Sequence, residues 1–147
     1  MHITRYTDYS LRVLIYLAVN QDRLATISNI ANSYGISKNH LMKIVQQLNQ
    51  RGHILATRGK NGGIKLNHTA EEINIGTLVR EIEDKNKLVE CFGEENQCVI
   101  TPNCQLKNIF AEAQENFFKT LDNYTLEDLI KGQNKVGLTQ LLTLATK

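Results

Sequence analysis

The chain has 147 residues, 41% hydrophobic and 22% charged, which is typical of one globular domain, and no uncharged apolar run approaches the roughly 18 residues of a membrane span. Residues 1–70 carry nine Lys or Arg side chains against two acids, a charge of +7, whereas residues 71–147 carry eight against thirteen, a charge of −5. A basic half joined to an acidic half is expected of a nucleic-acid-binding module attached to a part that does not touch phosphate.

Three helices are predicted in the basic half. Apolar residues at helical spacing predict the first over residues 7–19. Thr26 can cap a second helix that ends at Gly35, and Ser37 can cap a third that continues to Gly52. The tight turn between the second and third helices is typical of a helix-turn-helix, whose second helix enters the major groove of DNA.

The outward residues at the start of the third predicted helix are suited to DNA. Hydroxyl, amide, imidazole and ammonium groups can reach base edges and phosphates from this position, and Asn39 has the best chemistry for a base. A solvated helix face would carry the same residues, so the pattern alone does not decide the function. The candidate contacts are Ser37, Lys38, Asn39, His40 and Lys43.

A glycine-rich hairpin is predicted next. Short strands over residues 54–57 and 64–66 flank the run Arg58-Gly-Lys-Asn-Gly-Gly63, whose glycines permit a tight turn. Arg58, Lys60 and Asn61 would then form a wing beside the minor groove, whose negative potential favours a guanidinium group. Glycine-rich loops also bind nucleotides, but no Gly-Lys-Ser or Gly-Lys-Thr sequence and no strand-to-helix phosphate motif follows this one.

All three cysteines lie in a polar loop after a fourth predicted helix, over residues 75–83. Cys91, Cys98 and Cys104 fall within fourteen residues, which favours a shared metal centre, although the spacing lacks the paired C-x2-C of a zinc ribbon. Residues 1–7 lack the apolar region of an export signal, so we expect a reducing cytoplasm in which disulfides are rare. Three buried or idle thiols remain the alternative.

The sequence does not identify a fourth ligand. All four histidines precede Cys91, so a histidine within the loop is excluded. A nearby glutamate, a water molecule, or a residue brought in by folding or by a second subunit remain possible ligands. Thr101 is predicted to cap the next helix, with Cys104 in its first turn, where partial positive charge would stabilise an anionic cluster.

A long amphipathic helix is predicted over residues 105–121. Its apolar stripe is suited to dimerisation, since two-fold symmetric regulators read two half-sites of a palindromic operator, although packing within one subunit would also account for it. We expect a mainly α fold with a small β-hairpin: a winged helix-turn-helix over residues 1–84, a cysteine loop over 85–104, and a dimerisation helix and tail over 105–147. The stripe consists of Leu106, Ile109, Phe110, Ala113, Phe117 and Leu121.

The chain resembles a known family over nearly its whole length. Residues Tyr6–Arg12, Ser37–Leu41 and Arg58–Gly63, together with the three cysteines, are similar to the Rrf-two (BadM-type) winged-helix iron–sulfur transcriptional regulators. The runs Thr57–Ile64 and Leu121–Leu126 resemble the branch of that family that contains nitric-oxide-sensing repressors.

The resemblance implies a homodimeric repressor with one iron–sulfur cluster per subunit, 4Fe-4S rather than 2Fe-2S. It implies that Cys91, Cys98 and Cys104 ligate the cluster with Asp8 of the partner subunit. Arg12, one turn after Asp8 on the same helix face, could pair with Asp8 or neutralise the charge of the cluster. From its position alone, Asp8 would only balance a helix dipole. We hypothesise that nitric oxide attacks the iron and frees Asp8, a hard donor on a soft centre, so that operator binding weakens.

Other functions remain open. A related branch regulates iron–sulfur assembly, iron status or redox state, but its fourth ligand is a histidine three residues after the last cysteine, where this chain has Lys107. A zinc- or thiol-based regulator would use the same cysteines without iron or acid-labile sulfide. An enzyme is not expected, because the sequence shows no nucleophile–base pair or paired carboxylates.

Overall fold

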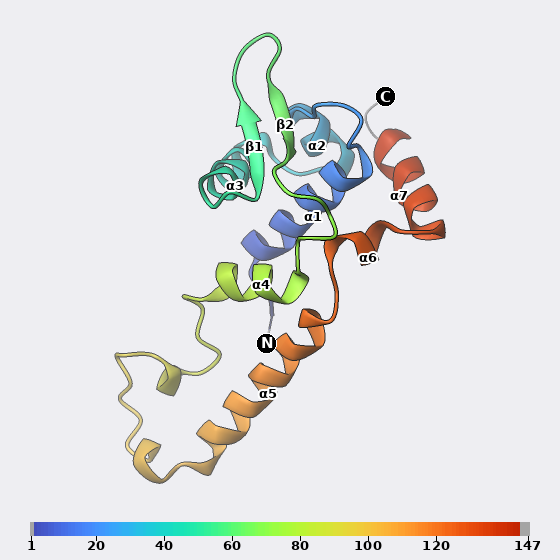
Figure 1. Cartoon of the computed structure of the whole chain (residues 1–147). Helices are drawn as coiled ribbons and strands as arrows, with labels where there is room; N and C mark the ends of the chain where they lie inside the picture. Colours follow the sequence, from blue (N-terminus) through green and yellow to red (C-terminus); the bar gives the residue numbers. More distant parts are fainter. Residues whose placement is uncertain (1, 145–147) are drawn as a thin grey trace.

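The structure is a computed structural model that describes residues 2–144. Within this range the chain forms seven α-helices, two short 3-10 turns and one two-stranded antiparallel sheet (Figure 1), so the expected class, mainly α with a small β-hairpin, is confirmed. The elements are α1 (Arg5–Val19), α2 (Ile27–Tyr34), α3 (Lys38–Gln50), β1 (Ile54–Thr57), β2 (Gly63–Leu66), α4 (Ile75–Glu83), η1 (Glu90–Phe92), η2 (Thr101–Asn103), α5 (Gln105–Asp122), α6 (Leu126–Ile130) and α7 (Gln133–Leu144). Among the described helices, none combines the length and apolar character needed to span a bilayer.

The two helices of the helix-turn-helix begin at the caps that the sequence predicts. At the start of α2 the Asn29 amide donates to Thr26 Oγ1 at 3.1 Å and the Thr26 amide donates to Asn29 Oδ1 at 3.0 Å. Gly35 ends α2 with a φ of 65°, and the Ser37 hydroxyl caps α3 by accepting from the His40 amide at 3.2 Å. These bonds satisfy amides that the helices leave unpaired, and they fix the tight turn.

The wing is the antiparallel hairpin of β1 and β2, in which Ile54 pairs with Leu66 and Thr57 with Gly63. Its second strand begins at Gly63, one residue before the predicted start. A Cβ atom on Gly62 would lie 2.1 Å from the carbonyl oxygen of Thr57, so only glycine lets the two sides of the turn approach this closely.

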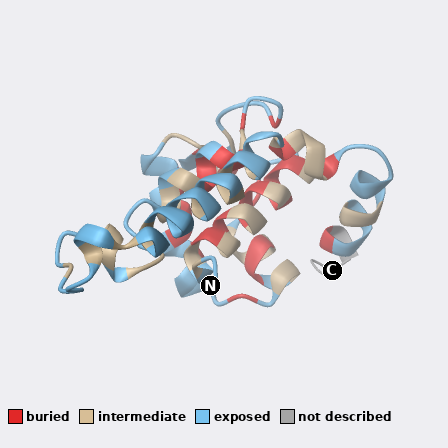
Figure 2. Ribbon diagram, turned by 90° about the horizontal axis from the view of Figure 1, so that it is seen from below, coloured by how far each residue is buried: buried red, intermediate tan, exposed pale blue. Residues whose placement is uncertain are grey.

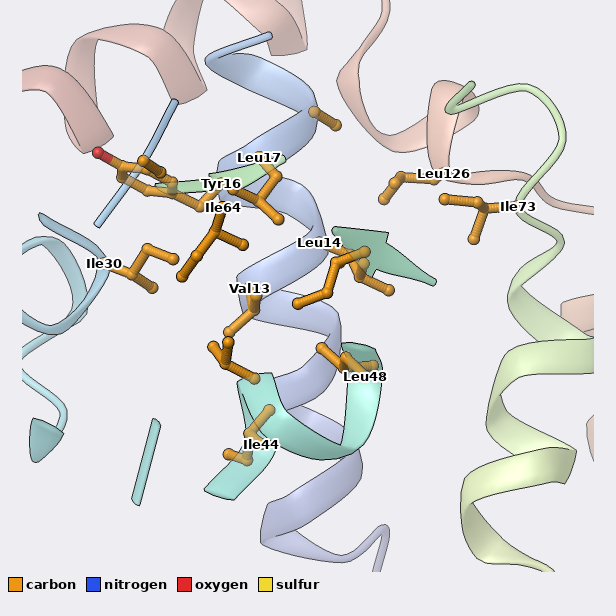
Figure 3. Close-up of a cluster of buried hydrophobic side chains, with 14 of the residues drawn as sticks. Val13, Leu14, Tyr16, Leu17, Ile30, Ile44, Leu48, Ile64, Ile73 and Leu126 are labelled. Atoms are coloured by element: carbon orange, nitrogen blue, oxygen red, sulfur yellow. The ribbon is translucent and has the colours of Figure 1, made fainter. Parts of the chain in front are cut away.

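The apolar core is built around α1. Figure 3 shows Val13, Leu14 and Leu17 of α1 among buried side chains from α2, α3, β2 and α6. Burying each such side chain contributes about 1.5–3 kcal/mol. The buried residues gather in the helical body, whereas α5 and the cysteine loop are exposed or half-buried (Figure 2). The core therefore holds the helix-turn-helix and the wing together as one unit.

The end of the described chain folds back onto this body, although the sequence gives little pattern beyond Leu129. Leu126 and Ile130 of α6 are buried against the core, and Leu142 of α7 is buried near α2, where its carbonyl oxygen accepts from Ser33 Oγ at 3.1 Å. Because α6 has five residues, it depends on tertiary contacts that no local pattern reveals.

We call residues 85–122 the arm, which consists of the cysteine loop and α5. The helix α5 has 18 residues and none of them is buried. It leaves the body beside α4 and carries the cysteine loop at its far end, away from the wing (Figure 1). The arm is thus attached to the body mainly at one end.

Candidate nucleic-acid interface and metal centre

Every side chain predicted to contact DNA is exposed, either on α3 and its cap or at the tip of the wing. The structure brings part of this set together around one groove of 820 Å³ between α3, the start of α2 and the wing. Of the predicted DNA contacts, Asn39, Lys43 and Arg58 line the groove, and the others lie outside its lining: Ser37, Lys38, His40, Lys60 and Asn61.

The groove has the charge that a polyanion requires. Within the described residues, Lys43 and Arg58 supply two positive charges to its lining, and no Asp or Glu belongs to it. Side-chain amides of Asn39 and Gln46 lie in the same lining and can bond to base edges. Cations around a concave surface without acids create a positive potential, which attracts a negatively charged ligand such as nucleic-acid phosphate.

The prediction from sequence missed part of this lining. Met42 and Gln46 belong to the groove, and helical spacing from Asn39 could have found them, because residues three, four and seven apart share a helix face. Thr26 and Ser28 also line it. No local signal marks these two residues, since they reach the groove only through the packing of α2 against α3.

The first turns of α1 hold the predicted acid in an ion pair. Arg12 Nη2 lies 3.0 Å from Asp8 Oδ2, and Arg12 Nε donates to Asp8 Oδ1 at 3.1 Å, as their spacing of four predicts. The guanidinium also lies over the rings of Tyr9 and Tyr34, at 5.4 and 5.9 Å from their centres. Both charged side chains are partly exposed, so the pair adds little to stability.

Two tyrosines connect this ion pair to the helix-turn-helix. The Tyr34 hydroxyl donates to the carbonyl oxygen of Arg12 at 2.8 Å. Burial raises the pKa of Tyr34 to about 12 despite the lowering effect of the Arg12 charge, so the phenol remains protonated as a donor. The ring of Tyr9 lies 6.5 Å from that of His40 in the first turn of α3.

The three cysteines are free thiols in a loop held by its own hydrogen bonds. Cys98 is exposed, whereas Cys91 and Cys104 are half-buried. The Cys98 amide donates to Asn96 Oδ1 at 3.0 Å, and the Gln97 amide donates to Glu90 Oε1 at 2.7 Å. These bonds order the backbone between the first two thiols.

The start of α5 differs from the prediction. Thr101 does not cap it, because its hydroxyl donates to the carbonyl oxygen of Cys98 and accepts from Asn96 Nδ2, both at 2.8 Å. Thr101 and Pro102 instead open the short turn η2, and the chain then extends at Cys104, the N-cap of α5. No side chain caps α5, so Cys104 stands at a helix start whose first amides have no side-chain acceptor.

The donor chemistry of the loop fits an iron–sulfur cluster. Three free thiols on one partly exposed loop are soft ligands of the type that such clusters use, and the start of α5 favours negative charge. Within residues 2–144 no three His, Cys, Asp or Glu side chains gather closely enough to hold a metal ion. The structure therefore supplies the ligand types on one loop without bringing them, or Asp8, to one point.

The apolar stripe on α5 is largely uncovered in the single chain. The exposed fractions of Leu106, Ile109 and Phe110 are 53%, 58% and 36%, and Ala113 is also exposed. Phe117 and Leu121, nearer to the body, are half-buried, and Phe118 packs against the core. The loop adds two more exposed apolar side chains, Val99 at 91% and Ile100 at 61%.

Comparisons with known proteins agree over almost the whole chain. The Rrf2 family, described as iron-dependent transcriptional regulators, matches residues 3–132. The HTH-type transcriptional regulator NsrR of Bacillus licheniformis is 49% identical over 138 residues, 92% of this chain and 96% of that protein. The NsrR of Bacillus subtilis is also 49% identical, over 98% of this chain and 99% of the relative.

Solved structures show the same architecture. CymR, the global cysteine regulator of B. subtilis, is 25% identical with a TM-score of 0.67, covering 88% of this chain and 95% of that chain. The oxidized form of Staphylococcus aureus CymR is 27% identical with a TM-score of 0.67, covering 90% and 98%. The T. potens IscR is 21% identical with a TM-score of 0.68, covering 88% and 85%, and supports the fold alone.

Proposed function

The chain belongs to the Rrf2 family of iron-dependent transcriptional regulators, and from this premise we propose that it is a homodimeric repressor that responds to nitric oxide through an iron–sulfur cluster. The observation that carries the proposal is the pairing of an acid-free groove between α3 and the wing with three free thiols on a separate arm. One part is suited to DNA and the other to a chemical signal.

The DNA interface consists of α3 and the wing. The N-terminal half of α3 enters the major groove, where Asn39 reads a base edge and Lys43 neutralises a phosphate. Arg58 at the wing reaches the adjacent minor groove. Their common groove, without acids in its described lining, supports this assignment.

The exposed stripe of α5 is proposed to contact a second copy of the chain. Soluble monomers rarely expose a continuous apolar patch, and Leu106, Ile109 and Phe110 form one on a helix that the body does not cover. A two-fold dimer would cover this face and would place two copies of α3 on the two half-sites of a palindromic operator.

The cluster, 4Fe-4S with one per subunit, would be held by Cys91, Cys98 and Cys104 with Asp8 of the partner subunit. When bound, it supplies iron that reacts with nitric oxide. The chain's own contribution is a carboxylate with an alternative partner: Arg12 already bonds Asp8 at 3.0 and 3.1 Å. The same turn of α1 meets α3 through Tyr9 and His40, so a movement of Asp8 would shift the recognition helix.

Anaerobic purification tests this function. We expect coloured protein with iron and acid-labile sulfide, which binds a duplex selected from a random pool and releases it when nitric oxide is added. The Asp8→Ala variant should lose most of this response, whereas Asp22→Ala, which removes an exposed acid without an ion pair among the described residues, should keep it. Colourless, iron-free protein that still releases the duplex when nitric oxide is added would contradict the proposal.

A thiol-based regulator is the second candidate, and the exposed Cys98 favours it. The structural likeness to the oxidized form of S. aureus CymR is consistent with that chemistry. The two candidates differ in the metal: a thiol-based regulator would bind DNA without iron and would respond to oxidants in a Cys98-dependent way. Iron and sulfide analysis therefore separates them.

A further inference from the structure

Helix α4 connects the arm to the DNA-reading elements of the same chain. Two consecutive residues near its end, Arg80 and Glu81, form ion pairs with different neighbours. Consecutive residues on a helix point about 100° apart, so adjacent side chains can hold two separate elements. The function proposed above uses neither residue.

Arg80 fastens α4 to α5. Its guanidinium donates to both carboxylate oxygens of Glu115 at 3.0 Å and to Asp122 Oδ2 at 2.9 Å, and it lies 4.7 Å from the centre of the Phe118 ring. These carboxylates raise the pKa of Arg80, and hydrogen bonding to Arg80 holds the pKa of Glu115 below its usual range. A forked donor between two carboxylates fixes direction as well as distance.

The backbones of α4 and α5 also approach each other closely beside the ion pairs of Arg80. A Cβ atom on Gly76 would lie 2.6 Å from the Asp122 amide nitrogen, and Asn74 Nδ2 donates to the Asp122 carbonyl oxygen at 2.7 Å. The end of α5 is therefore held both by Arg80, near the end of α4, and by Asn74, the N-cap of α4. A tilt of the arm would have to move α4 or break these contacts.

Glu81 fastens α4 to the end of α3 and the start of the wing. Arg51 Nη1 donates to Glu81 Oε1 at 3.2 Å and to the Glu81 carbonyl oxygen at 3.0 Å. His53 Nε2 lies 2.9 Å from Glu81 Oε2. Arg51 is the C-cap of α3, and His53 directly precedes β1, so Glu81 meets both DNA-reading elements where they join.

We propose that Arg80 and Glu81 are positioning residues that carry a movement of the thiol arm to the recognition helix and the wing of the same chain. The inference rests on the proposed function, because it assumes that loading the thiols changes operator affinity. It adds a route within one subunit to the contact between subunits through Asp8. All of these ion pairs are partly exposed, so they set geometry more than stability.

The test compares operator affinity with and without the cluster, using the full chain and the selected duplex. For wild type we expect loading to change the dissociation constant by about 5- to 150-fold, the usual range of coupling between two sites. We call the dissociation constant of the loaded protein divided by that of the cluster-free protein the affinity ratio. Arg80→Ala and Glu81→Ala should each bring the affinity ratio towards one, with iron content, sulfide content and cluster-free affinity unchanged. The double variant should lose no more than either single variant, because both changes interrupt one route.

Matched controls and a second measurement separate a positioning role from general damage. Lys119→Ala and Glu71→Ala remove exposed charges that form no ion pair among the described residues, and both should keep the wild-type ratio. Loading should slow amide hydrogen exchange over residues 48–57 in wild type and should leave it unchanged in Arg80→Ala.

Two failures are distinguishable. Equal affinity of loaded and cluster-free wild type would contradict the proposed function. A wild-type ratio that persists in Arg80→Ala and Glu81→Ala, with the same exchange protection, would overturn the positioning role. If Arg80→Ala does not fold or load, Arg80→Lys decides. An ammonium group keeps the charge but not the planar guanidinium geometry that spans Glu115 and Asp122, so a wild-type affinity ratio in Arg80→Lys would refute the inference.

Discussion

At the scale of single residues, Glu83 shows how hydrogen bonds to a carboxylate can outweigh the effect of its burial on the pKa. Its carboxylate accepts from the Thr4 amide at 3.0 Å, from Thr4 Oγ1 at 2.7 Å, from the Thr7 hydroxyl and from Asn86 Nδ2 at 2.9 Å. Burial raises the pKa of Glu83, but these hydrogen bonds outweigh burial and lower it. The end of α4 thereby holds the start of α1, just before Asp8.

The first prediction concerns the stability that Glu83 provides. A lowered pKa means that its contribution is present above the ordinary value of 4.5 and is lost as the pH falls through the folded-state pKa. Glu83→Gln should reduce the free energy of unfolding by about 1–2 kcal/mol at neutral pH, and the difference should shrink in acid. Urea unfolding of the cluster-free protein measures both; an equal loss at Glu71→Gln, an exposed acid, would disprove the role.

The second prediction separates the two kinds of DNA contact proposed for the groove. Asn39→Ala should cost about 1–3 kcal/mol against the selected duplex and relax the preference at one base position. Lys43→Ala should weaken binding to all sequences alike and reduce the slope of log affinity against log salt by about one. Competition binding over a range of salt checks both, with Lys85→Ala in the arm as the unaffected control. The same loss of specificity in both variants would contradict this division of roles.

At the scale of elements, the sequence is informative where an element's ends are decided locally. Thr26, Gly35 and Ser37 were predictable because their caps involve residues within a few positions. Thr101 was predicted wrongly because its hydroxyl bonds inside the loop, to Cys98 and Asn96, instead of capping a helix. Capping chemistry does not say whether a hydroxyl will accept from a helix amide or bond to other nearby groups in the loop.

Contacts between distant elements could not be predicted at all. Arg80 meets acids 35 and 42 positions away, and Leu126 of α6 enters a core formed by earlier helices. The candidate DNA residues were predictable as a set, but only the packing of α2, α3 and the wing shows that three of them share a groove. That the three thiols bind one shared cluster stays a prediction.

The third prediction tests the wing as an element. Gly62→Ala places a methyl group against the Thr57 carbonyl oxygen and should distort the turn that carries Arg58. We expect about a tenfold or greater loss of DNA affinity with the helical circular dichroism unchanged. Gly137→Ala, whose added methyl group meets open space, serves as the control. Wild-type affinity in Gly62→Ala would show that the wing turn does not position a DNA contact.

At the scale of the whole molecule, the fold separates two surfaces of different character. The proposed DNA-binding groove and the thiol loop lie at opposite ends of the molecule, joined by α4 and α5 (Figure 1). The apolar face of α5 lies along the arm between them. Association of two chains along that face would therefore leave both grooves open.

The fourth prediction concerns this association. Ile109→Glu places a charge in the exposed stripe of α5 and should convert a dimer into a monomer, because burying an unpaired carboxylate costs several kcal/mol. Sedimentation velocity of wild type and variant measures the change. Val136→Glu on α7, where the side chain is 60% exposed, against 58% for Ile109, should leave the mass unchanged. A dimeric Ile109→Glu variant would place the interface elsewhere.

The length of α5 has a genetic consequence. Eighteen residues of helix extend about 27 Å, which carries the thiols away from the body that contains their own Asp8. If the two ligand sets meet only across a pair of chains, then two defective alleles, one altered at Asp8 and the other at a cysteine, would together rebuild one intact sensor in a mixed dimer. A cell that expresses both should recover part of a response that neither allele gives alone.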